Sequence, residues 1–337
     1  MRRATLATRL LAIGLATFLL TACQQPPQEL KFSGPTMGTT YHVTVIPGEV
    51  SASENLDQVI LDALNRINDQ MSTYQPDSDL SKFNELPIGE VVELPAEFAA
   101  VMKISEQAYT DTEGAFDPTV GPLVDLWGFG PRDTGDVVPD ADAIADALAE
   151  MGFEGLELDG ERLIKHEDVR LDLSAVAKGY AAELVSNELR SLGLYNHLVE
   201  VGGEMRLSGV KGNGERWKIG IEQPNLGQGA VNLAVSLTDA GVATSGDYRN
   251  YFEQNGVRYS HTIDPRTGYP VTHKLASVTV IADNAGYADA MATAFMVLGS
   301  EKSLVLAEKL DLAIYLIVKQ GDSFVTLHSS RFEHFLN

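Results

Sequence analysis

Residues 243–270 concentrate side chains that could do chemistry. Hydroxyl, carboxylate, guanidinium and imidazole groups alternate there with turn-forming Gly and Pro residues. Predicted strands at 241–244 and 257–260 hold this stretch, and a β-rich stretch at 277–281 follows it. Polar groups that a scaffold holds in this way are often binding or catalytic groups, although a surface loop can also be merely solvated. We call residues 243–270 the polar ribbon, and its polar side chains include those of Ser245, Asp247, Tyr248, Arg249, His261, Asp264, Arg266 and Thr267.

His261 is the one histidine of the polar ribbon. An imidazole changes its charge near neutral pH, so His261 could act as an acid, a base or a hydrogen-bond donor to phosphate. An ordinary hydrogen-bonding loop residue is the alternative. The run from Asp264 to Gly268 has the composition of a tight turn, in which Arg266 could simply pair with Asp264.

A second candidate group lies on a predicted helix at 285–298. Asp289 and Thr293 are four residues apart and therefore share one face of that helix. Their neighbours on the helix are almost all apolar, so the carboxylate is costly to bury unless charge or hydrogen bonds compensate. A carboxylate, a hydroxyl and backbone carbonyls form a hard-oxygen set that suits Mg²⁺. The alternative is an acid near the helix start that the helix dipole favours.

A third candidate group surrounds the start of a predicted helix at 174–193. Asp172 ends a predicted strand, Ser174 is the predicted N-cap residue, and Lys178 lies one turn into the helix. The free N–H groups and the positive dipole end of a helix N-terminus can bind phosphate, and Lys178 adds positive charge. The alternative is a helix-flanking acid beside a solvated lysine.

Two aromatic residues, Tyr74 and Phe116, could stack on a ring system, although core packing is the default for Phe116. Tyr74 lies in the polar segment 71–84, whose Asp, Ser and Pro are ordinary turn residues. The segment 114–131 has too many Gly and Pro residues for a helix and too many large apolar residues for disorder. It is either the rigid wall of a pocket or a packed connection.

Several common catalytic motifs are absent from the sequence. There is no GxSxG nucleophile elbow and no His-rich zinc motif, which disfavours a serine hydrolase and a zinc protease. There is also no GxGxxG after a first strand, no P-loop and no repeat period. Gly202-Gly203, between two predicted strands, indicates a tight hairpin turn more than a close approach to a ligand.

Strands and helices alternate irregularly in the predicted order, and many strands have the spacing of hairpins. That order predicts an α+β fold of mixed or antiparallel sheets with packed helices. A capping box of Ser51 and Glu54 precedes a helix at 56–71. The other predicted helices are 95–109, one after Pro139, and 301–310. The remaining predicted strands are 41–46, 155–159, 162–165, 169–173, 197–201, 205–210, 217–221, 231–237, 312–318 and 324–328.

The first 22 residues have the pattern of a bacterial secretion signal. Arg2, Arg3 and Arg9 form a basic region, and an apolar run at 10–20 is too short to span a bilayer as a mature helix. Leu20-Thr21-Ala22-Cys23 follows and resembles a lipobox, in which the Cys is lipidated and becomes the first residue. The alternative is an ordinary signal peptide with an incidental Cys. Residues 23–30 are then the lipidated Cys and a tether.

The length, the net charge and the cysteine count of the chain limit its domain number and its possible partners. Removal of residues 1–22 from the 337 leaves 315, which is enough for one large domain or two interlocked subdomains at 31–337. The loss of three Arg takes the formal charge from −22 to −25, which disfavours nucleic acid and anionic lipid as partners. Cys23 is the only Cys, so the mature chain has no internal disulfide and no Cys nucleophile.

Together, these motifs closely resemble one family, the ApbE-type flavin transferases, which are FAD:protein FMN transferases. The matching pieces keep the order of the family and run through nearly the whole mature chain. A lipobox is also common in this family. The pieces are 36-TMGTTY-41, 71-MSTYQPDSDLSKFN-84, 114-GAFDPTVGPLVDLWGFGP-131, 172-DLSAVAKGYA-181, 199-VEVGGEMR-206, 243-ATSGDYRNYF-252, 258-RYSHTIDPRTGYPV-271 and 287-YADAMATAFMVLG-299.

The resemblance implies an ApbE-like (T-fold-like) α+β fold that binds FAD, with Mg²⁺ at the pyrophosphate. It implies that FMN moves onto a Thr, sometimes Ser, hydroxyl of a target protein while AMP leaves. The family varies at the position of Tyr74, and a tyrosine there favours transfer over hydrolysis. The implied metal ligands are the side chains of Asp289 and Thr293 and the carbonyls of Ala175 and Ala292. The implied FAD contacts are Met37, Tyr74, Ala115, Phe116, Asp117, Asp172, Lys178, His261 and Ile263.

The chemistry that the family performs suits these residue types. Phosphoryl transfer needs charge neutralisation and in-line placement more than covalent help. Either His261 or Asp289 would take the proton from the incoming hydroxyl. An Asp that binds Mg²⁺ is a poor base because the metal lowers its pKa, which favours His261.

The resemblance also implies a place and a partner. The place is the periplasmic side of the bacterial inner membrane, through the lipid anchor, although Gln24 is not the Asp of a retention signal. The partners would be acceptor domains of membrane electron-transport flavoproteins, such as sodium-pumping complexes. Two other functions fit the same residues: an Mg²⁺-dependent FAD pyrophosphatase that gives FMN and AMP, and a non-enzymatic flavin-binding lipoprotein of the periplasm.

Overall fold

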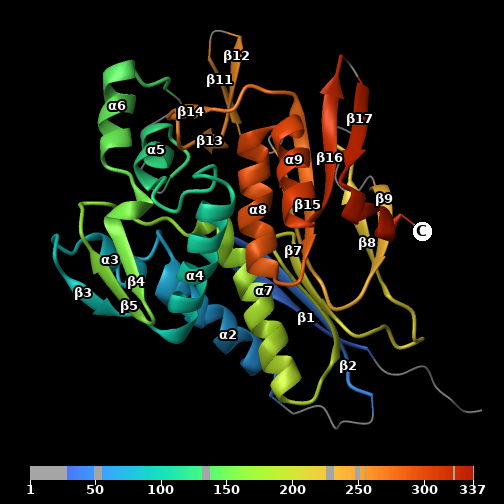
Figure 1. Ribbon diagram of the computed structural model, residues 1–337. Coiled ribbons are helices and arrows are strands. Elements are labelled where there is room, and N and C mark those ends of the chain that lie inside the picture. The colour runs from blue at the N-terminus through green and yellow to red at the C-terminus, as the bar shows by residue number, and fades with distance from the viewer. Residues whose placement is uncertain are drawn as a thin grey trace, which may run out of the picture.

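An eight-stranded sheet forms the centre of the computed structural model, which describes residues 29–48, 55–130, 137–224, 231–246, 251–254, 256–321 and 323–336 (Figure 1). Its strand order is β1-β2-β6-β7-β10-β15-β16-β17, and every neighbouring pair is antiparallel. Helices cover one face of this sheet, and the β8–β9 pair lies against the other. The predicted α+β fold with antiparallel sheets is therefore confirmed.

The central strands are β1 (Leu30–Thr36), β2 (Thr39–Ile46), β6 (Asn196–Val201), β7 (Glu204–Ser208), β10 (Gly241–Gly246), β15 (Leu275–Ala282), β16 (Ala313–Gln320) and β17 (Ser323–His328). Smaller sheets pair β5 (Arg162–Lys165) with β3 (Val91–Glu93) and β4 (Leu156–Asp159), β8 (Trp217–Glu222) with β9 (Val231–Leu237), β11 (Tyr251–Gln254) with β12 (Val257–Ser260), and β13 (Ile263–Asp264) with β14 (Tyr269–Pro270).

The α-helices are α2 (Leu56–Met71), α3 (Asp79–Asn84), α4 (Ala96–Asp111), α5 (Gly121–Leu126), α6 (Ala141–Ala149), α7 (Ser174–Ser191), α8 (Ala285–Leu298) and α9 (Ser300–Leu310). Two short 3₁₀ helices are η1 (Phe153–Gly155) and η2 (Ser330–Phe335). None of the helices in the described ranges is long and apolar enough to cross a membrane.

Local chemistry explains where the predicted elements were wrong. Residues 169–173 are not a strand, because Asp172 N donates to Pro118 O at 2.7 Å, away from any sheet. Ser174 is the first residue of α7 and not its N-cap, and Asp172 Oδ1 accepts from its N–H at 2.8 Å. The turn segment 71–84 contains α3, which Ser78 caps through the N–H of Ser81.

Some predictions fall on parts of the chain that the structure does not describe. These are the signal peptide 1–22, Cys23 with most of the tether, the capping box of Ser51 and Glu54, and Asp247, Tyr248 and Arg249 of the polar ribbon. The strand β1 was not predicted at all. Its Gly34 and Pro35 lower its strand propensity, and Pro is tolerated there because β1 is an edge strand.

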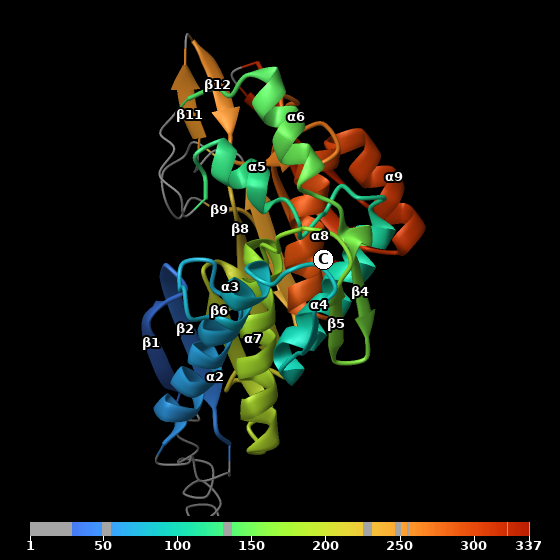
Figure 2. The same ribbon diagram turned by 90° about the vertical axis from the view of Figure 1, so that its left-hand side faces the viewer.

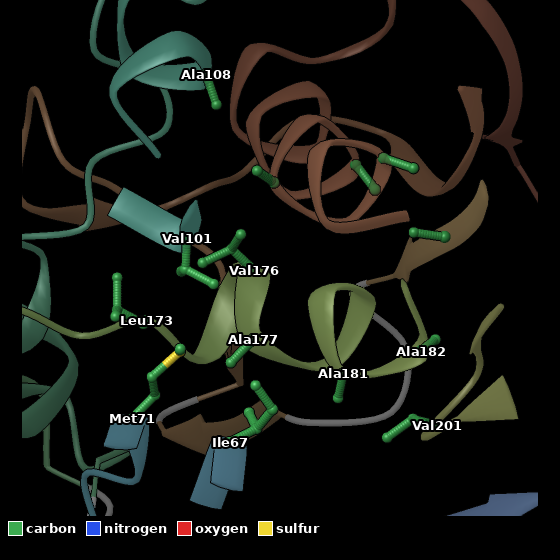
Figure 3. Close-up of a cluster of buried hydrophobic side chains, with 14 of the residues drawn as sticks. Ile67, Met71, Val101, Ala108, Leu173, Val176, Ala177, Ala181, Ala182 and Val201 are labelled. Carbon is green, nitrogen blue, oxygen red and sulfur yellow. The ribbon is translucent and has the colours of Figure 1, made fainter. Parts of the chain in front are cut away.

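The main hydrophobic core lies between the central sheet and the layer of α2, α4, α7 and α8. Figure 3 shows part of it, with Ile67 of α2 and Val101 of α4 near Val176 and Ala177 of α7. Helix α7 lies at the centre of this layer and contacts α2, α4 and α8. Its small side chains, such as Ala181, let the neighbouring helix backbones approach closely. Burial of this apolar surface holds the first turn of α7 in a fixed place.

Two further clusters complete the packing. Trp217, Val235, Leu237 and Phe332 belong to the cluster that joins β8, β9 and η2 to the opposite face of the sheet. The last cluster holds α5, α6 and the β11–β12 hairpin at one end of the molecule, as Figures 1 and 2 show. In it, Trp127 Nε1 donates to Gly268 O at 2.9 Å, which fixes the polar ribbon to the segment 114–131.

Helices α7 and α8 cross in close backbone contact at Gly179. A Cβ added at Gly179 would lie 2.3 Å from Ala285 O and 2.7 Å from Asp289 Cβ. Both distances are shorter than real Cβ contacts, so only Gly fits here without a shift of one helix. The α7–α8 crossing therefore depends on the absence of a side chain at one position.

We expect Gly179→Ala to lower the free energy of unfolding by about 2 kcal/mol or more, because the new methyl group overpacks the crossing. Urea unfolding followed by circular dichroism would measure the change. Gly121→Ala is a matched control, since its added Cβ would come no nearer than 3.6 Å to another residue. Equal stability of Gly179→Ala and wild type would show that the two helices can separate freely.

Candidate active site

A cavity of about 750 Å³ brings the three candidate groups of the sequence together. The first turn of α7 contributes Ala175 and Lys178, and α8 contributes Asp289 and Thr293. The polar ribbon contributes Ser245, His261 and Ile263 to the lining, together with residues of the β1–β2 and β6–β7 turns, of β8 and of the segment 114–131. Residues more than a hundred positions apart in the chain thus form one site.

Asp289 is buried in the floor of the cavity, with 3% of its surface exposed. Its Oδ2 accepts a hydrogen bond from Gly179 N at 2.9 Å and lies 3.9 Å from Lys178 Nζ. Burial raises the pKa of Asp289, while Lys178 and the Gly179 hydrogen bond act in the opposite direction. Asp289 lies in the second turn of α8, whose start Asn284 caps, so it is not the dipole-favoured acid at a helix start.

Lys178 lies between two buried carboxylates. Its Nζ is 3.5 Å from Glu204 Oε1 and 3.9 Å from Asp289 Oδ2, and it donates to Ser174 O at 3.4 Å. Burial by itself would lower the pKa of Lys178, but the charges of Asp289 and Glu204 outweigh it and raise the pKa. Lys178 is half-buried and paired with two carboxylates, which disfavours the alternative of a solvated lysine.

Glu204 is a residue of the site that the sequence did not single out. It is 6% exposed, it lines the cavity, and its Oε2 has no hydrogen-bond partner among the described residues. Burial raises the pKa of Glu204 to about 8, against the lowering effect of Lys178. Its position directly after Gly202-Gly203 was the available signal, but a charged residue beside a hairpin turn is usually solvated.

The predicted metal ligands differ in their placement. Asp289, Thr293 and Ala175 line the cavity, whereas Ala292 is buried and does not line it. Thr293 Oγ1 lies 3.4 Å from Ser245 Oγ, which brings a second hydroxyl to the same spot. No group of three or more His, Cys, Asp or Glu that could hold a metal ion occurs in the described ranges.

The implied ligand set contains only one carboxylate, but its oxygen donors still fit Mg²⁺. An α-helical N–H bonds to the carbonyl four residues earlier, which for Gly179 is the carbonyl of Ala175. Gly179 N donates to Asp289 Oδ2 at 2.9 Å, and a carbonyl oxygen has two lone pairs, so the Ala175 carbonyl can accept a further ligand. Carboxylate, hydroxyl and carbonyl oxygens together are the hard ligands that Mg²⁺ prefers.

The predicted FAD contacts divide into two groups. Lys178, His261 and Ile263 line the cavity. The others do not line it. Asp172 accepts a hydrogen bond from Ser174 N at the start of α7 and lines a smaller hollow of about 370 Å³. Tyr74 is 72% exposed. Met37 packs at the β1–β2 turn, and Ala115 and Phe116 are buried in or beside the main core. Asp117 accepts hydrogen bonds from Thr119. The contacts of all these residues with FAD stay predictions.

The polar ribbon contains both a cavity-lining residue, His261, and a tight turn at 264–268. His261 faces the cavity, with its ring 6.2 Å from that of Phe129 in an edge-on arrangement. Arg266 donates to both carboxylate oxygens of Asp264, at 2.8 and 2.7 Å, which confirms the tight turn. The segment 114–131 provides cavity wall through Val120, Val124 and Phe129, and it also contains the short helix α5.

Comparison with known proteins identifies the family. The model of the ApbE family matches residues 37–316, which is most of the chain. This chain belongs to the ApbE family. Its resemblance in sequence to that family is therefore confirmed.

Relatives of this ApbE-family chain are similar over almost their whole length. The FAD:protein FMN transferase of Vibrio cholerae is 44% identical, over 96% of this chain and 98% of the relative. The enzyme of the same name from Haemophilus influenzae is 42% identical, over 97% of each chain. That from Escherichia coli K12 is 36% identical, over 98% of this chain and 97% of the relative.

Solved structures of ApbE proteins have the same fold. The apo form of the Pseudomonas stutzeri flavinyl transferase ApbE superposes with a TM-score of 0.86 at 42% identity, over 93% of this chain and 98% of that one. The ApbE protein of Thermotoga maritima gives a TM-score of 0.82 at 31% identity, over 92% and 100%. The predicted ApbE-like fold is thereby confirmed.

The buried glutamate of this ApbE-family chain makes the stability of the ligand-free protein depend on pH. The pKa of Glu204 is about 8 in the folded chain and 4.5 in a model peptide, so the folded state binds more protons between these values. Stability must therefore fall as pH rises through this window. Burial lowers the pKa of His197 from 6.5 to about 4, so His197 makes stability rise with pH between these two values. Above pH 6.5 His197 adds no further pH dependence, and the effect of Glu204 remains.

We expect the free energy of unfolding in EDTA to fall between pH 6.5 and 8, by on the order of a kcal/mol or more. Glu204→Gln should flatten this dependence. Glu301→Gln, at an exposed position in the first turn of α9, is the control and should leave the slope unchanged. Urea titrations at several pH values measure the slope, and a slope that survives Glu204→Gln would contradict the assignment.

Proposed function

We infer that this protein is an FAD:protein FMN transferase, which moves FMN from FAD onto a target protein and releases AMP. Relatives with this name are 36–44% identical to the chain over almost its full length. The observation that carries the function in this chain is the cavity in which Lys178, Asp289 and Thr293 meet the start of α7. A cation and a helix N-terminus beside hard oxygen ligands suit a bound pyrophosphate.

We further propose that the transfer depends on Mg²⁺ and that the acceptor is a Thr, or Ser, hydroxyl. The side chains of Asp289 and Thr293 and the carbonyls of Ala175 and Ala292 would hold the metal. When bound, Mg²⁺ would neutralise negative charge on the pyrophosphate oxygens. Lys178 contributes positive charge from the chain itself, and the two buried carboxylates keep it protonated.

The bond changes balance with one proton transfer. The hydroxyl oxygen of the acceptor forms a bond with the phosphorus of the FMN half. The bond between that phosphorus and the bridging oxygen breaks, and AMP leaves with this oxygen. The hydroxyl proton passes to a base in the cavity. In-line placement of the acceptor and the leaving group is the main task of the protein in such a reaction.

His261 is the base that the geometry favours. It comes from the polar ribbon and lines the same cavity as Asp289 and Thr293. Asp289 is engaged by the N–H of Gly179 and lies near Lys178, so its accepting capacity is partly used. An imidazole also changes protonation near the working pH, which suits a general base.

The setting of the reaction is a proposal that rests on the sequence. The run Leu20-Thr21-Ala22-Cys23 supports a lipid anchor at Cys23, and thus a location on the periplasmic side of the inner membrane. The acceptors would be flavoprotein subunits of membrane electron-transport complexes, such as sodium-pumping ones. The formal charge of −22 disfavours nucleic acid as a partner.

One incubation separates transfer from the two other functions. Purified protein, FAD and Mg²⁺ are mixed with membranes from a strain of the source organism that lacks this gene. We expect fluorescent flavin that stays on an acceptor band after denaturing electrophoresis, and AMP in solution. Free FMN without a labelled band would indicate a pyrophosphatase with water as the acceptor, and intact FAD would indicate a carrier.

Site variants test the assigned roles in the same incubation. Asp289→Asn should lower the labelling rate at least about 100-fold, because it removes the charged metal ligand. Asp283→Asn, an exposed acid just before α8, is the matched control and should label at the wild-type rate. His261→Ala should lose about 100-fold or more if His261 is the base. A wild-type rate for His261→Ala would remove it from the mechanism.

A further inference from the structure

The central sheet opens between β7 and β10 at the end that faces the cavity. The last residue pair that joins these strands sets Val242 opposite Met205. β10 runs on to Gly246, whereas β7 begins at Glu204 and turns back into β6. Along the described ranges, no strand pairs with the end of β10 on this side. The sheet therefore has an internal open edge.

Alternation along β10 shows which backbone groups face this opening. Ala240 faces β7, because its N donates to Leu207 O at 3.2 Å and its O accepts from Leu207 N at 2.8 Å. The hydrogen-bonding groups of successive residues point to opposite sides of a strand. Val242, Thr244 and Gly246 therefore point toward the β7 side. Thr244 and Gly246 lie beyond the paired part, so their N–H and C=O groups point into the opening.

The cavity occupies this opening. Residues from both of its edges line the cavity, Gly203 and Met205 on one side and Thr244 and Gly246 on the other. Thr244 is exposed and Gly246 is half-buried. A Cβ added at Gly203 would meet no atom within 4 Å, so the space beside the β6–β7 turn is open. An extended chain segment could therefore enter beside β10.

Side chains along β10 alternate between the two faces of the sheet. Ser245 points to the α8 face, where its Oγ lies 3.4 Å from Thr293 Oγ1. A residue directly opposite Ser245 on a paired strand would have its side chain on that same face. Its side chain would then lie toward Thr293 and Asp289.

We propose that the open edge of β10 binds the acceptor polypeptide as an added antiparallel strand, with the acceptor threonine opposite Ser245. This inference rests on the proposed transferase function. Main-chain hydrogen bonds to Thr244 and Gly246 hold the residues on either side of that threonine, as in other cases of strand addition. The register directs the hydroxyl toward α8. Because Glu200 and Glu222 line the cavity, the segment that binds is neutral or basic.

Thr244→Pro tests the edge from the side of the enzyme. Proline removes the N–H that points into the opening, and an edge position tolerates it. Thr244→Val is the matched control, since it keeps that N–H. Both variants lose the hydrogen bond of 2.8 Å between Thr244 Oγ1 and Thr279 Oγ1. Covalent flavin labelling of the membrane acceptor and quenching of FAD fluorescence on binding are measured for each full-length variant.

We expect Thr244→Pro to lower the labelling rate at limiting acceptor by at least about fivefold, the loss of roughly one hydrogen bond. Thr244→Pro should also label at least about fivefold more slowly than Thr244→Val, and the two variants should bind FAD with affinities within about twofold of each other. Equal labelling by both variants would overturn the inference. So would a loss of FAD affinity that matches the loss of labelling, because the edge would then belong to the FAD site. Absence of labelling by the wild type would overturn the transferase function itself.

Substitutions in the labelled acceptor test the same register without any change to the enzyme. Residues one position before and after the acceptor threonine hydrogen-bond to β10 in this arrangement, and residues two positions away do not. Proline at either near position should lower labelling at least about fivefold more than proline at either far position. Equal effects at near and far positions, or larger effects at the far ones, would overturn the strand addition.

Discussion

The close crossing of α7 and α8 at Gly179 is the constraint on which the rest of the site depends. Because Gly179 has no side chain, the two helices approach until Asp289 Oδ2 lies 2.9 Å from Gly179 N. This contact places the carboxylate of α8 beside the first turn of α7, where Ala175 and Lys178 lie. Both helices contribute apolar residues to the main core, so the packing of that core sets the positions of the polar groups that α7 and α8 carry.

Electrostatics at this crossing leave the ligand-free site incomplete. Two buried carboxylates, Asp289 and Glu204, share the single ammonium group of Lys178, and Glu204 Oε2 has no hydrogen-bond partner in the described part of the chain. Burial of charge without full compensation is costly, so such a site favours a bound cation or a proton. Two carboxylates and one ammonium group carry a net negative charge, which a bound divalent metal ion would reverse. The positive charge that results would suit the pyrophosphate of the proposed transfer.

Local patterns in the sequence predicted most helices and strands, and they predicted that Asp289 and Thr293 share one face of α8. The apolar spacing predicted α2 and α8 at their observed bounds, and the four-residue spacing of Asp289 and Thr293 placed both on one face toward the cavity. The contact between Gly179 and Asp289 joins residues 110 positions apart, and no local spacing encodes such a contact. It became visible only through the packing of α7 against α8.

The errors have physical causes as well. Glu204 was overlooked because nothing local shows that a glutamate after a hairpin turn is buried beside a lysine from another helix. The segment 169–173 has strand composition, but its Leu171 bonds to the side chain of Asn84 in place of a neighbouring strand. Tyr74 and Asp172 lie outside the main cavity, so their contacts with FAD depend on how the ligand extends beyond it.

The central claim is that FAD and its metal ion are bound where α7 crosses α8. Crystals grown with FAD and Mn²⁺ in place of Mg²⁺ test it directly, since the anomalous signal locates the metal. We expect an anomalous peak between the Asp289 carboxylate and the Thr293 hydroxyl, with the FAD pyrophosphate beside it and near Lys178. A peak at another place, or FAD bound in the cavity with its pyrophosphate away from α7 and α8, would contradict the account.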